Sequence, residues 1–285
     1  MKAKPIKVLV MSVGQFEKNY TAKYFCRIGA RKDIVVCLPN EKKGNAASYQ
    51  QQGIEVYVYD EKKYINSNFE YFGFKPRNCG GVGRQGIAEA VERYSKDYLC
   101  FQVDDDYSSF SVRFYVSKTV RKWENLKKWI YAAEEFYRKT GCDMLAKTGA
   151  TIQDKVISNH KVFNNFIMRE GNPLNFQGFA ALCSDDQRFN AYVNLLQRHP
   201  MLSVSWMQVD FHQNQGDRSD GNAILYNSDC SWKKSFALKM MFPWCVMQTV
   251  TKEKNRALFR ENIQAKKLFP PIFLEEGGKL VARVR

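Results

Sequence analysis

Three consecutive carboxylates, Asp104, Asp105 and Asp106, follow an apolar stretch at 98–103 that has the composition of a buried strand. Like charges this close repel one another, and a buried ion is costly unless a partner compensates it. A hard divalent cation such as Mg²⁺ or Mn²⁺ is a suitable partner, because it takes oxygen ligands from one or two carboxylates plus substrate phosphates. In an extended segment, Asp104 and Asp106 point to one side and Asp105 to the other. The triplet therefore predicts that Asp104 and Asp106 bridge a metal ion and a diphosphate; the alternative is a solvated acidic turn.

A glycine-rich stretch at 79–86, which contains Arg84, precedes a helical pattern at 84–95. Glycines let backbone amides approach a phosphate, a helix N-terminus favours an anion, and an arginine neutralises a diphosphate. The stretch does not follow the first strand, as a dinucleotide-binding fingerprint would, and it lacks the Gly-Lys-Ser/Thr of a P-loop. It predicts a second phosphate contact through Arg84, with a flexible turn before a helix as the alternative.

The elements that must position these residues alternate between strand-like and helix-like patterns. Strand patterns lie at 7–13, 33–38, 54–59 and 98–103, and helical patterns at 20–28 and 84–95. This alternation predicts an α/β fold with a mostly parallel central sheet and flanking helices. Ligands of such sheets bind beyond the carboxyl ends of the strands, which is where the acidic triplet falls.

The second half of the chain has a mixed pattern of strands and helices. Its clearest helical segments are an amphipathic one at 120–137 and a charged one at 251–267. The sequence has no internal repeat and no linker rich in Pro, Gly or Ser. We therefore expect a single domain over residues 1–285.

Apolar runs and cysteines bear on the cellular compartment. The longest apolar runs, such as 34–38 and 179–183, fall far short of the roughly 18 residues that span a bilayer. The basic N-terminus is followed by a short apolar stretch and not by the core of a signal peptide. Eight cysteines without a CxxC pair indicate buried reduced thiols rather than disulfides or zinc ligands. We expect a cytoplasmic monomer that does not contact a membrane.

The charge balance is strongly basic, with 44 Lys and Arg against 29 Asp and Glu and a formal net charge of +15. This excess favours a polyanionic partner such as nucleic acid or a phosphorylated ligand, although solubility alone can also maintain it. Some basic residues lie near aromatic ones on which an exposed base can stack. These are Arg113, Lys118, Arg121, Lys122, Lys233 and Lys234. Each also suits the solvated face of an element that packs on the core.

Together these features resemble the GT-A class of nucleotide-sugar glycosyltransferases. The resemblance covers roughly residues 6–212 and rests on the strand and loop at 8–14, the helix with Arg84 and the acidic segment at 103–107. It implies donor contacts from Ser12, Val13, Gly14, Arg84, Asp104 and Asp105, and metal ligation by Asp104, Asp106 and His212. It also implies a catalytic base after a later strand, for which Asp210 is the candidate, although the Glu that usually precedes this base is missing.

Within that class, the segment 101–110 and the basic character of the chain resemble the TET/JBP-associated glycosyltransferases and the related phage enzymes. This resemblance implies a donor half at about 1–110, an acceptor half at about 111–285, and dependence on Mn²⁺ or Mg²⁺. The enzyme would move glucose or a pentose such as arabinose from a UDP-sugar to the hydroxyl of 5-hydroxymethylcytosine in double-stranded phage DNA, in the host cytoplasm. Two alternatives stay open. One is a glycosyltransferase or nucleotidyltransferase that acts on a small molecule or a protein, and the other is a non-catalytic DNA-binding protein.

Overall fold

The computed structural model describes residues 5–64 and 80–113 and, beyond them, separate strands of the second half. Those strands are β6 (Val120–Lys122), β7 (Met144–Lys147), β8 (Val156–Ser158), β9 (Phe166–Arg169), β10 (Met201–Val204), β11 (Met207–Phe211), β12 (Val246–Thr251), β13 (Arg256–Glu261), β14 (Phe273–Glu276) and β15 (Lys279–Ala282).

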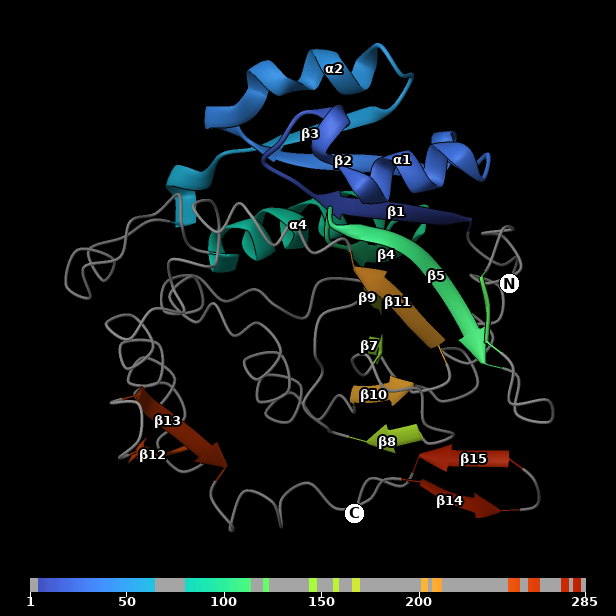
Figure 1. Cartoon of the computed structure of the whole chain (residues 1–285), viewed down its shortest axis with the longest axis vertical. Coiled ribbons are helices and arrows are strands. Elements are labelled where there is room, and N and C mark those ends of the chain that lie inside the picture. Colours follow the sequence, from blue (N-terminus) through green and yellow to red (C-terminus); the bar gives the residue numbers. More distant parts are fainter. Residues whose placement is uncertain are drawn as a thin grey trace.

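Four parallel strands form one half of an eight-stranded sheet and lie in the upper part of the view in Figure 1. They are β1 (Ile6–Met11), β2 (Ile34–Pro39), β3 (Glu55–Tyr59) and β4 (Leu99–Val103), in the spatial order β3-β2-β1-β4. All residues of β2 and β4 are buried, as expected of parallel strands that are covered on both faces. The structure thus confirms the predicted α/β class and the parallel order of the first four strands.

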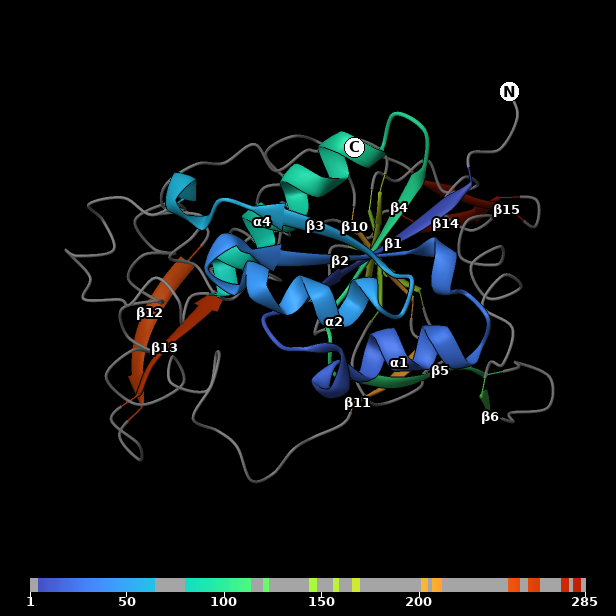
Figure 2. The ribbon, with the colours of Figure 1, turned by 90° about the horizontal axis from the view of Figure 1, so that it is seen from above.

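Helices cover both faces of these four strands, as Figure 2 shows from above. The helices α1 (Tyr20–Arg27) and α2 (Ala46–Gln50) lie on one face, and α4 (Gly80–Tyr94) lies on the other. Short 3-10 turns complete the connections: η1 (Phe16–Lys18), η2 (Arg31–Asp33), η3 (Asn40–Asn45) and η4 (Glu61–Tyr64). None of the helices within the described ranges is both long enough and apolar enough to cross a bilayer.

Alternate residues of the strands build the two layers of the core. Val8, Val36 and Phe101 face α1, where Phe25 packs on them and all four side chains are fully buried. The opposite face carries Cys37 and Cys100, which are buried free thiols, and Cys26 of α1 is a free, partly exposed thiol. Of these three cysteines, Cys37 and Cys100 are buried as expected, whereas Cys26 is not.

The remaining described strands extend and flank the parallel core. β9 pairs antiparallel with β4, and β7, β10 and β8 follow it to complete an eight-stranded sheet. β5 (Tyr107–Arg113) leaves this sheet and lies between β11 and β6 in a second sheet of three strands. Two further pairs, β12 with β13 and β14 with β15, are antiparallel.

Two helix predictions in the second half are wrong in their described parts. The segment expected to begin a helix at 120 starts as β6, which pairs with β5. The segment expected to be helical at 251–267 contributes to an antiparallel pair, in which Val246–Thr251 faces Arg256–Glu261. In both cases the segment pairs with the strand that precedes it in the chain, and the spacing of apolar and charged residues within the segment does not reveal this pairing.

Candidate functional site

The strand order places two loops side by side at the carboxyl edge of the sheet. The chain leaves β1 toward β2 through α1 on one face, and it returns through α4 on the other face to add β4 to the free side of β1. Val10 pairs with Val103, so the loop at 12–14 and the acidic triplet at 104–106 leave neighbouring strands at the same level. A position where the strand order reverses in this way is the usual ligand site of an open α/β sheet.

A hydrogen bond between side chains joins these two loops. The hydroxyl of Ser12, which is 2% exposed, donates from Oγ to Oδ2 of Asp105 at 2.7 Å. The same Oγ accepts the backbone amide of Gly14 at 3.2 Å. Ser12 therefore turns the chain after β1 and fixes that turn to the acidic triplet.

Tyr49 of α2 supports the same turn from behind. Its buried hydroxyl donates to the carbonyl oxygen of Gly14 at 2.9 Å and lies 3.3 Å from Oγ of Ser12. It accepts a hydrogen bond from Nδ2 of Asn19 at 3.2 Å, while Oδ1 of Asn19 caps α1 by accepting the amide of Ala22 at 2.8 Å. The loop after β1 is thus anchored to both helices that cover its face of the sheet.

Thr21, in the first turn of α1, attaches the backbone of the triplet. Its hydroxyl donates to the carbonyl oxygen of Asp104 at 2.5 Å and accepts the amide of Tyr107 at 2.9 Å. Its own amide donates to the carbonyl oxygen of Asp105 at 3.2 Å. The first turn of a helix has amides without a partner inside the helix, and the triplet supplies one such partner.

The triplet is a turn and not an extended segment. Asp105 and Asp106 occupy the turn between β4 and β5, so the expected alternation of side chains does not apply. Asp105 points toward Ser12, and Oδ2 of Asp104 lies 3.2 Å from the hydroxyl of the buried Tyr107. Asp104 and Asp105 are partly buried, whereas Asp106 is exposed.

Burial, and to a smaller extent the neighbouring charge of Asp104, together raise the pKa of Asp105 from the ordinary 3.8 to about 6. The hydrogen bond from Ser12 acts in the opposite direction, because it stabilises the carboxylate. Two carboxylates at this edge therefore favour a cation nearby, which would compensate both.

A metal ion held by protein ligands alone does not fit the described residues. No group of three or more His, Cys, Asp or Glu side chains in those ranges is placed to hold one. Asp104 and Asp106, two positions apart at the turn, supply the kind of oxygen ligands that suit Mg²⁺ or Mn²⁺ shared with a diphosphate, since such ions commonly take only one or two carboxylates from the protein. His212, the predicted third ligand, lies outside the described residues.

The glycine-rich stretch does not form the flexible turn that was its alternative interpretation, because α4 already begins at Gly80 and not at Arg84. Instead, two of its glycines allow the helix to approach the sheet. A Cβ atom on Gly83 would lie 2.5 Å from Sδ of Met11, and one on Gly86 would lie 2.5 Å from three ring atoms of Tyr59. Met11 and Tyr59 end β1 and β3, so α4 starts at the carboxyl edge of the sheet.

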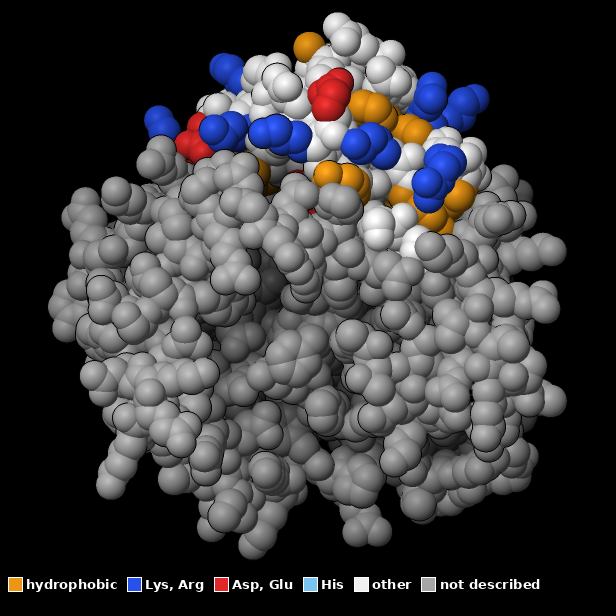
Figure 3. All heavy atoms as spheres, viewed as in Figure 1, with side chains coloured by type: hydrophobic (Ala, Val, Ile, Leu, Met, Phe, Trp, Pro, Cys, Tyr) orange, Lys and Arg blue, Asp and Glu red, His pale blue; other side chains and the backbone are white. Residues whose placement is uncertain are grey.

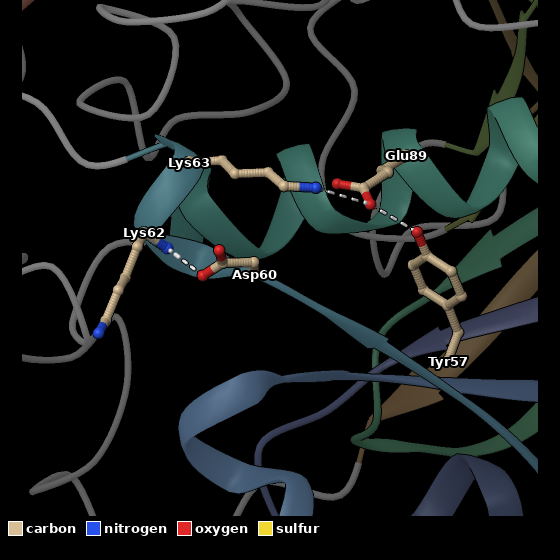
Figure 4. Close-up of polar contacts among 5 residues, drawn as sticks. All are labelled: Tyr57, Asp60, Lys62, Lys63 and Glu89. Atoms are coloured by element: carbon tan, nitrogen blue, oxygen red, sulfur yellow. Dashed lines mark hydrogen bonds and ion pairs between the residues drawn. The ribbon is translucent and has the colours of Figure 1, made fainter.

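Arg84 belongs to the first turns of α4, and nothing is described of its side chain. The helix itself is fixed by Glu89, which Figure 4 shows between two partners. Oε1 of Glu89 accepts the hydroxyl of Tyr57 at 2.7 Å and lies 3.5 Å from Nζ of Lys63 in η4. The backbone of Arg84 directly follows Gly83, which approaches Met11 at the end of β1.

The structure also brings Asp210 toward the triplet. β11 pairs antiparallel with β5, with Asp210 opposite Ser109 and Phe211 opposite Tyr107, and the register shifts between Asp210 and Phe211. The backbone of Asp210 therefore lies beside the residues that directly follow the triplet, about a hundred positions earlier in the chain. Nothing is described of its side chain.

Three of the predicted basic residues share one strand pair. Arg113 of β5 pairs with Val120 of β6. The next two residues of β6, Arg121 and Lys122, pair with Val112 and Ser111 of β5. Lys118, Lys233 and Lys234 lie outside the described residues. The structure thus groups the backbones of Arg113, Arg121 and Lys122 on β5, the strand that leads away from the triplet, and on its partner β6.

Sequence reasoning missed Asn19, Thr21 and Tyr49. Asn19 had a local signal, since an Asn before a helical pattern is a common N-cap. Thr21 and Tyr49 had none, because their partners at the site are far away in the sequence.

Comparisons with known proteins assign neither a family nor a function. No family model matches the chain, and no curated protein matches it. A solved structure described as the crystal structure of a mycobacterial protein is similar over 90% of this chain and 83% of its own, with 8% identity and a TM-score of 0.46. A likeness at this level carries no argument about fold family or activity.

Proposed function

We propose that this chain is a metal-dependent glycosyltransferase of the GT-A type, with a UDP-sugar as its donor substrate. The observation that carries the proposal is the meeting of the loop at 12–14 with the acidic triplet, where the strand order of a parallel sheet reverses. This edge is where α/β sheets bind ligands, and adjacent carboxylates suit a cation that accompanies a diphosphate.

The residues take distinct roles in the proposal. Asp104 and Asp106 hold Mg²⁺ or Mn²⁺, with His212 as a third ligand, and the ion neutralises the charge of the departing diphosphate. The loop at 12–14 faces the nucleoside, and Arg84 faces the diphosphate. If configuration is inverted, Asp210 accepts the proton of the acceptor hydroxyl while that oxygen bonds to the sugar and the bond from the sugar to the phosphate oxygen breaks.

Double-stranded DNA with a modified pyrimidine is the acceptor that the charge distribution favours. Residues 111–285 hold 27 Lys and Arg against 16 Asp and Glu, whereas residues 1–110 hold 17 against 13. On the face shown in Figure 3, the coloured Lys and Arg side chains lie singly or in small groups among other side chains. Most of the excess charge thus belongs to the half proposed to face the acceptor, where each phosphate contact releases counterions.

A transfer assay with the full chain tests the proposal. The protein is incubated with Mn²⁺ and separate UDP-sugars, including UDP-glucose and a UDP-pentose, and with DNA that contains 5-hydroxymethylcytosine, with glycans or with proteins as acceptors. We expect a mass gain of one hexose or pentose on the DNA, and binding to DNA that weakens steeply as salt rises. A gain of sugar mass on a glycan or a protein would show that this molecule, and not DNA, is the acceptor. A gain of nucleotide mass would indicate a nucleotidyltransferase. Salt-dependent DNA binding without any response to UDP and Mn²⁺ indicates a non-catalytic DNA-binding protein.

The variant Asp106→Ala tests the metal half of the proposal. Asp106 is exposed, so we expect the stability of the variant to stay within about 0.5 kcal/mol of wild type. We expect loss of transfer and of the rise in melting temperature that UDP with Mn²⁺ produces, because only a ligand that binds the folded state produces that rise. Asp97→Ala removes an exposed carboxylate from the turn before β4 and is the matched control. Full transfer by Asp106→Ala would contradict the assignment.

A further inference from the structure

We propose that Asp105 and Ser12 are positioning residues that hold the loop after β1 against the acidic triplet, and that neither is itself a ligand of the metal ion or of the nucleotide. This inference rests on the proposed function, since it concerns the same donor site. It revises the sequence-based expectation that both residues contact the donor.

The hydrogen-bonding capacity of Ser12 is already used inside the protein. A serine hydroxyl has one hydrogen and two lone pairs. Its hydrogen points to Asp105, one lone pair accepts the amide of Gly14, and Oη of Tyr49 lies 3.3 Å away. With 2% of its surface exposed, Ser12 has no free face to offer a ligand. The parts of this loop that can meet a nucleotide are therefore the exposed Val13 and the backbone next to it.

The carboxylate of Asp105 is also engaged in a hydrogen bond inside the protein, and Asp105 is less exposed than Asp106. Asp105 is partly buried and directs Oδ2 at a hydroxyl of the neighbouring loop, whereas Asp106 is exposed. The 2.7 Å bond from Ser12 is a charge-assisted one when Asp105 is ionised, and such bonds are short and about twice as strong as neutral ones. Asp105 thus sets where the loop after β1 lies relative to Asp104 and Asp106.

The hydrogen bond between Ser12 and Asp105 can be removed without unfolding the triplet, because a second set of contacts holds the triplet's backbone. Thr21 holds the backbone of the triplet through the carbonyl oxygens of Asp104 and Asp105, and that contact needs neither the Asp105 carboxylate nor Ser12. Loss of the Asp105 carboxylate leaves the Ser12 hydroxyl to turn toward Tyr49, the other acceptor within reach. The backbone of the triplet then stays in place while the loop after β1 loses its connection to it.

A double-mutant cycle on ligand affinity tests the proposal. The affinity for UDP in the presence of Mn²⁺ is measured by calorimetry for the full-length wild type, Asp105→Ala, Asp105→Asn, Ser12→Ala and the double variant Ser12→Ala with Asp105→Ala. Ser48→Ala is the control, because the Ser48 hydroxyl makes comparable bonds, to the amide of Phe16 and the carbonyl oxygen of Asn45, without contact to the triplet. Thermal melts of each variant establish that it folds.

We expect the alanine variants of Ser12 and Asp105 to lose affinity for UDP through the same broken bond, and the Asp105→Asn variant to keep most of that affinity. Ser12→Ala and Asp105→Ala each weaken UDP binding about tenfold, the size expected for one hydrogen bond to a charged group. The double variant is no weaker than Ser12→Ala, because Ser12→Ala already breaks the bond through which Asp105 acts. Asp105→Asn keeps an acceptor for Ser12 and stays within about threefold of wild type, and Ser48→Ala binds like wild type.

Other outcomes overturn the proposal in recognisable ways. If Asp105→Asn is as weak as Asp105→Ala, the carboxylate itself is a ligand; if the two single losses add, the residues act separately. If Asp105→Ala does not fold, Ser12→Ala and Asp105→Asn decide. The proposal requires that Ser12→Ala weakens UDP binding about tenfold while Asp105→Asn stays within about threefold of wild type, and the opposite pattern contradicts it. A wild-type protein that binds no UDP with Mn²⁺ refutes the proposed function, and this failure is visible before any variant is compared.

Discussion

Replacing Asp105 by asparagine should stabilise the metal-free protein above pH 6, although it alters the candidate site. The carboxylate of Asp105 is partly buried beside Asp104, and this environment raises its pKa to about 6 from the ordinary 3.8. Folding therefore disfavours the ionised form that is present at neutral pH. Asparagine has nearly the same shape, keeps an acceptor for the Ser12 hydroxyl and carries no charge.

The magnitude follows from the difference between the two pKa values. The folded-state pKa and the ordinary pKa of Asp105 differ by about 2, which corresponds to about 3 kcal/mol of free energy. Because the folded-state pKa is raised, the stability contributed by a neutral Asp105 is fully present below pH 3.8 and is lost as the pH rises through about 6. The free energy of unfolding of Asp105→Asn should therefore equal that of wild type near pH 4 and exceed it by up to about 3 kcal/mol at pH 8. In a chain of this size that is a gain of roughly 5–10 °C in melting temperature.

The assay is a series of thermal and urea melts between pH 4 and 8, in EDTA so that no divalent cation binds the triplet. Asp97→Asn, which replaces an exposed carboxylate, is the control and should differ from wild type by less than about 0.5 kcal/mol throughout. A stability difference between Asp105→Asn and wild type that does not change with pH would refute the reasoning. A less stable Asp105→Asn at pH 8 would show that the bond from Ser12 to the carboxylate outweighs the cost of burying the charge.

Two further predictions concern the elements that carry the site. Gly86→Ala should destabilise the protein by about 1–3 kcal/mol in urea melts, because its Cβ atom would lie 2.5 Å from the ring of Tyr59, whereas Gly44→Ala, with no atom within 4 Å, should change the stability by less than about 0.5 kcal/mol. Equal effects of the two substitutions would contradict the close approach of α4. Burial opposes ionisation of Glu55, but hydrogen bonds from Lys7 and Tyr94 outweigh it and lower the pKa of Glu55 below its ordinary 4.5. The stability that this carboxylate contributes is present above pH 4.5 and is lost as the pH falls through the lowered pKa, so the melting temperatures of Glu55→Gln and wild type should converge in acid; a constant gap between them would contradict the pairing with Lys7.

Local sequence patterns were sufficient for the four parallel strands and for the helices α1 and α4, but they did not predict α2 or β5. Each of the four parallel strands has an apolar run that ends at a polar or glycine-containing segment, and α1 begins after Asn19 as a capped helix should. These signals lie within a few residues of the element they define. The position of the triplet follows from them directly, because it is continuous with β4 in the chain.

Local patterns failed where pairing with the preceding strand decides the conformation, and not the spacing of side chains within the segment. The residues at 120–122 carry a helical spacing of apolar side chains but pair with β5, and those at 256–261 carry the charges of a surface helix but pair with β12. The glycines of α4 suggested a phosphate-binding turn, and their structural reason is instead the close contact with Met11 and Tyr59.

The sequence by itself determined that a parallel α/β half exists and that three carboxylates end one of its strands. Only the tertiary structure decided that β4 lies beside β1, that Asp105 turns toward Ser12, and that the strand with Asp210 returns to the residues after the triplet. Strand and helix signals come from the spacing of neighbouring side chains. The direction of a carboxylate depends instead on a hydroxyl 93 positions away, which only the completed sheet brings within 2.7 Å.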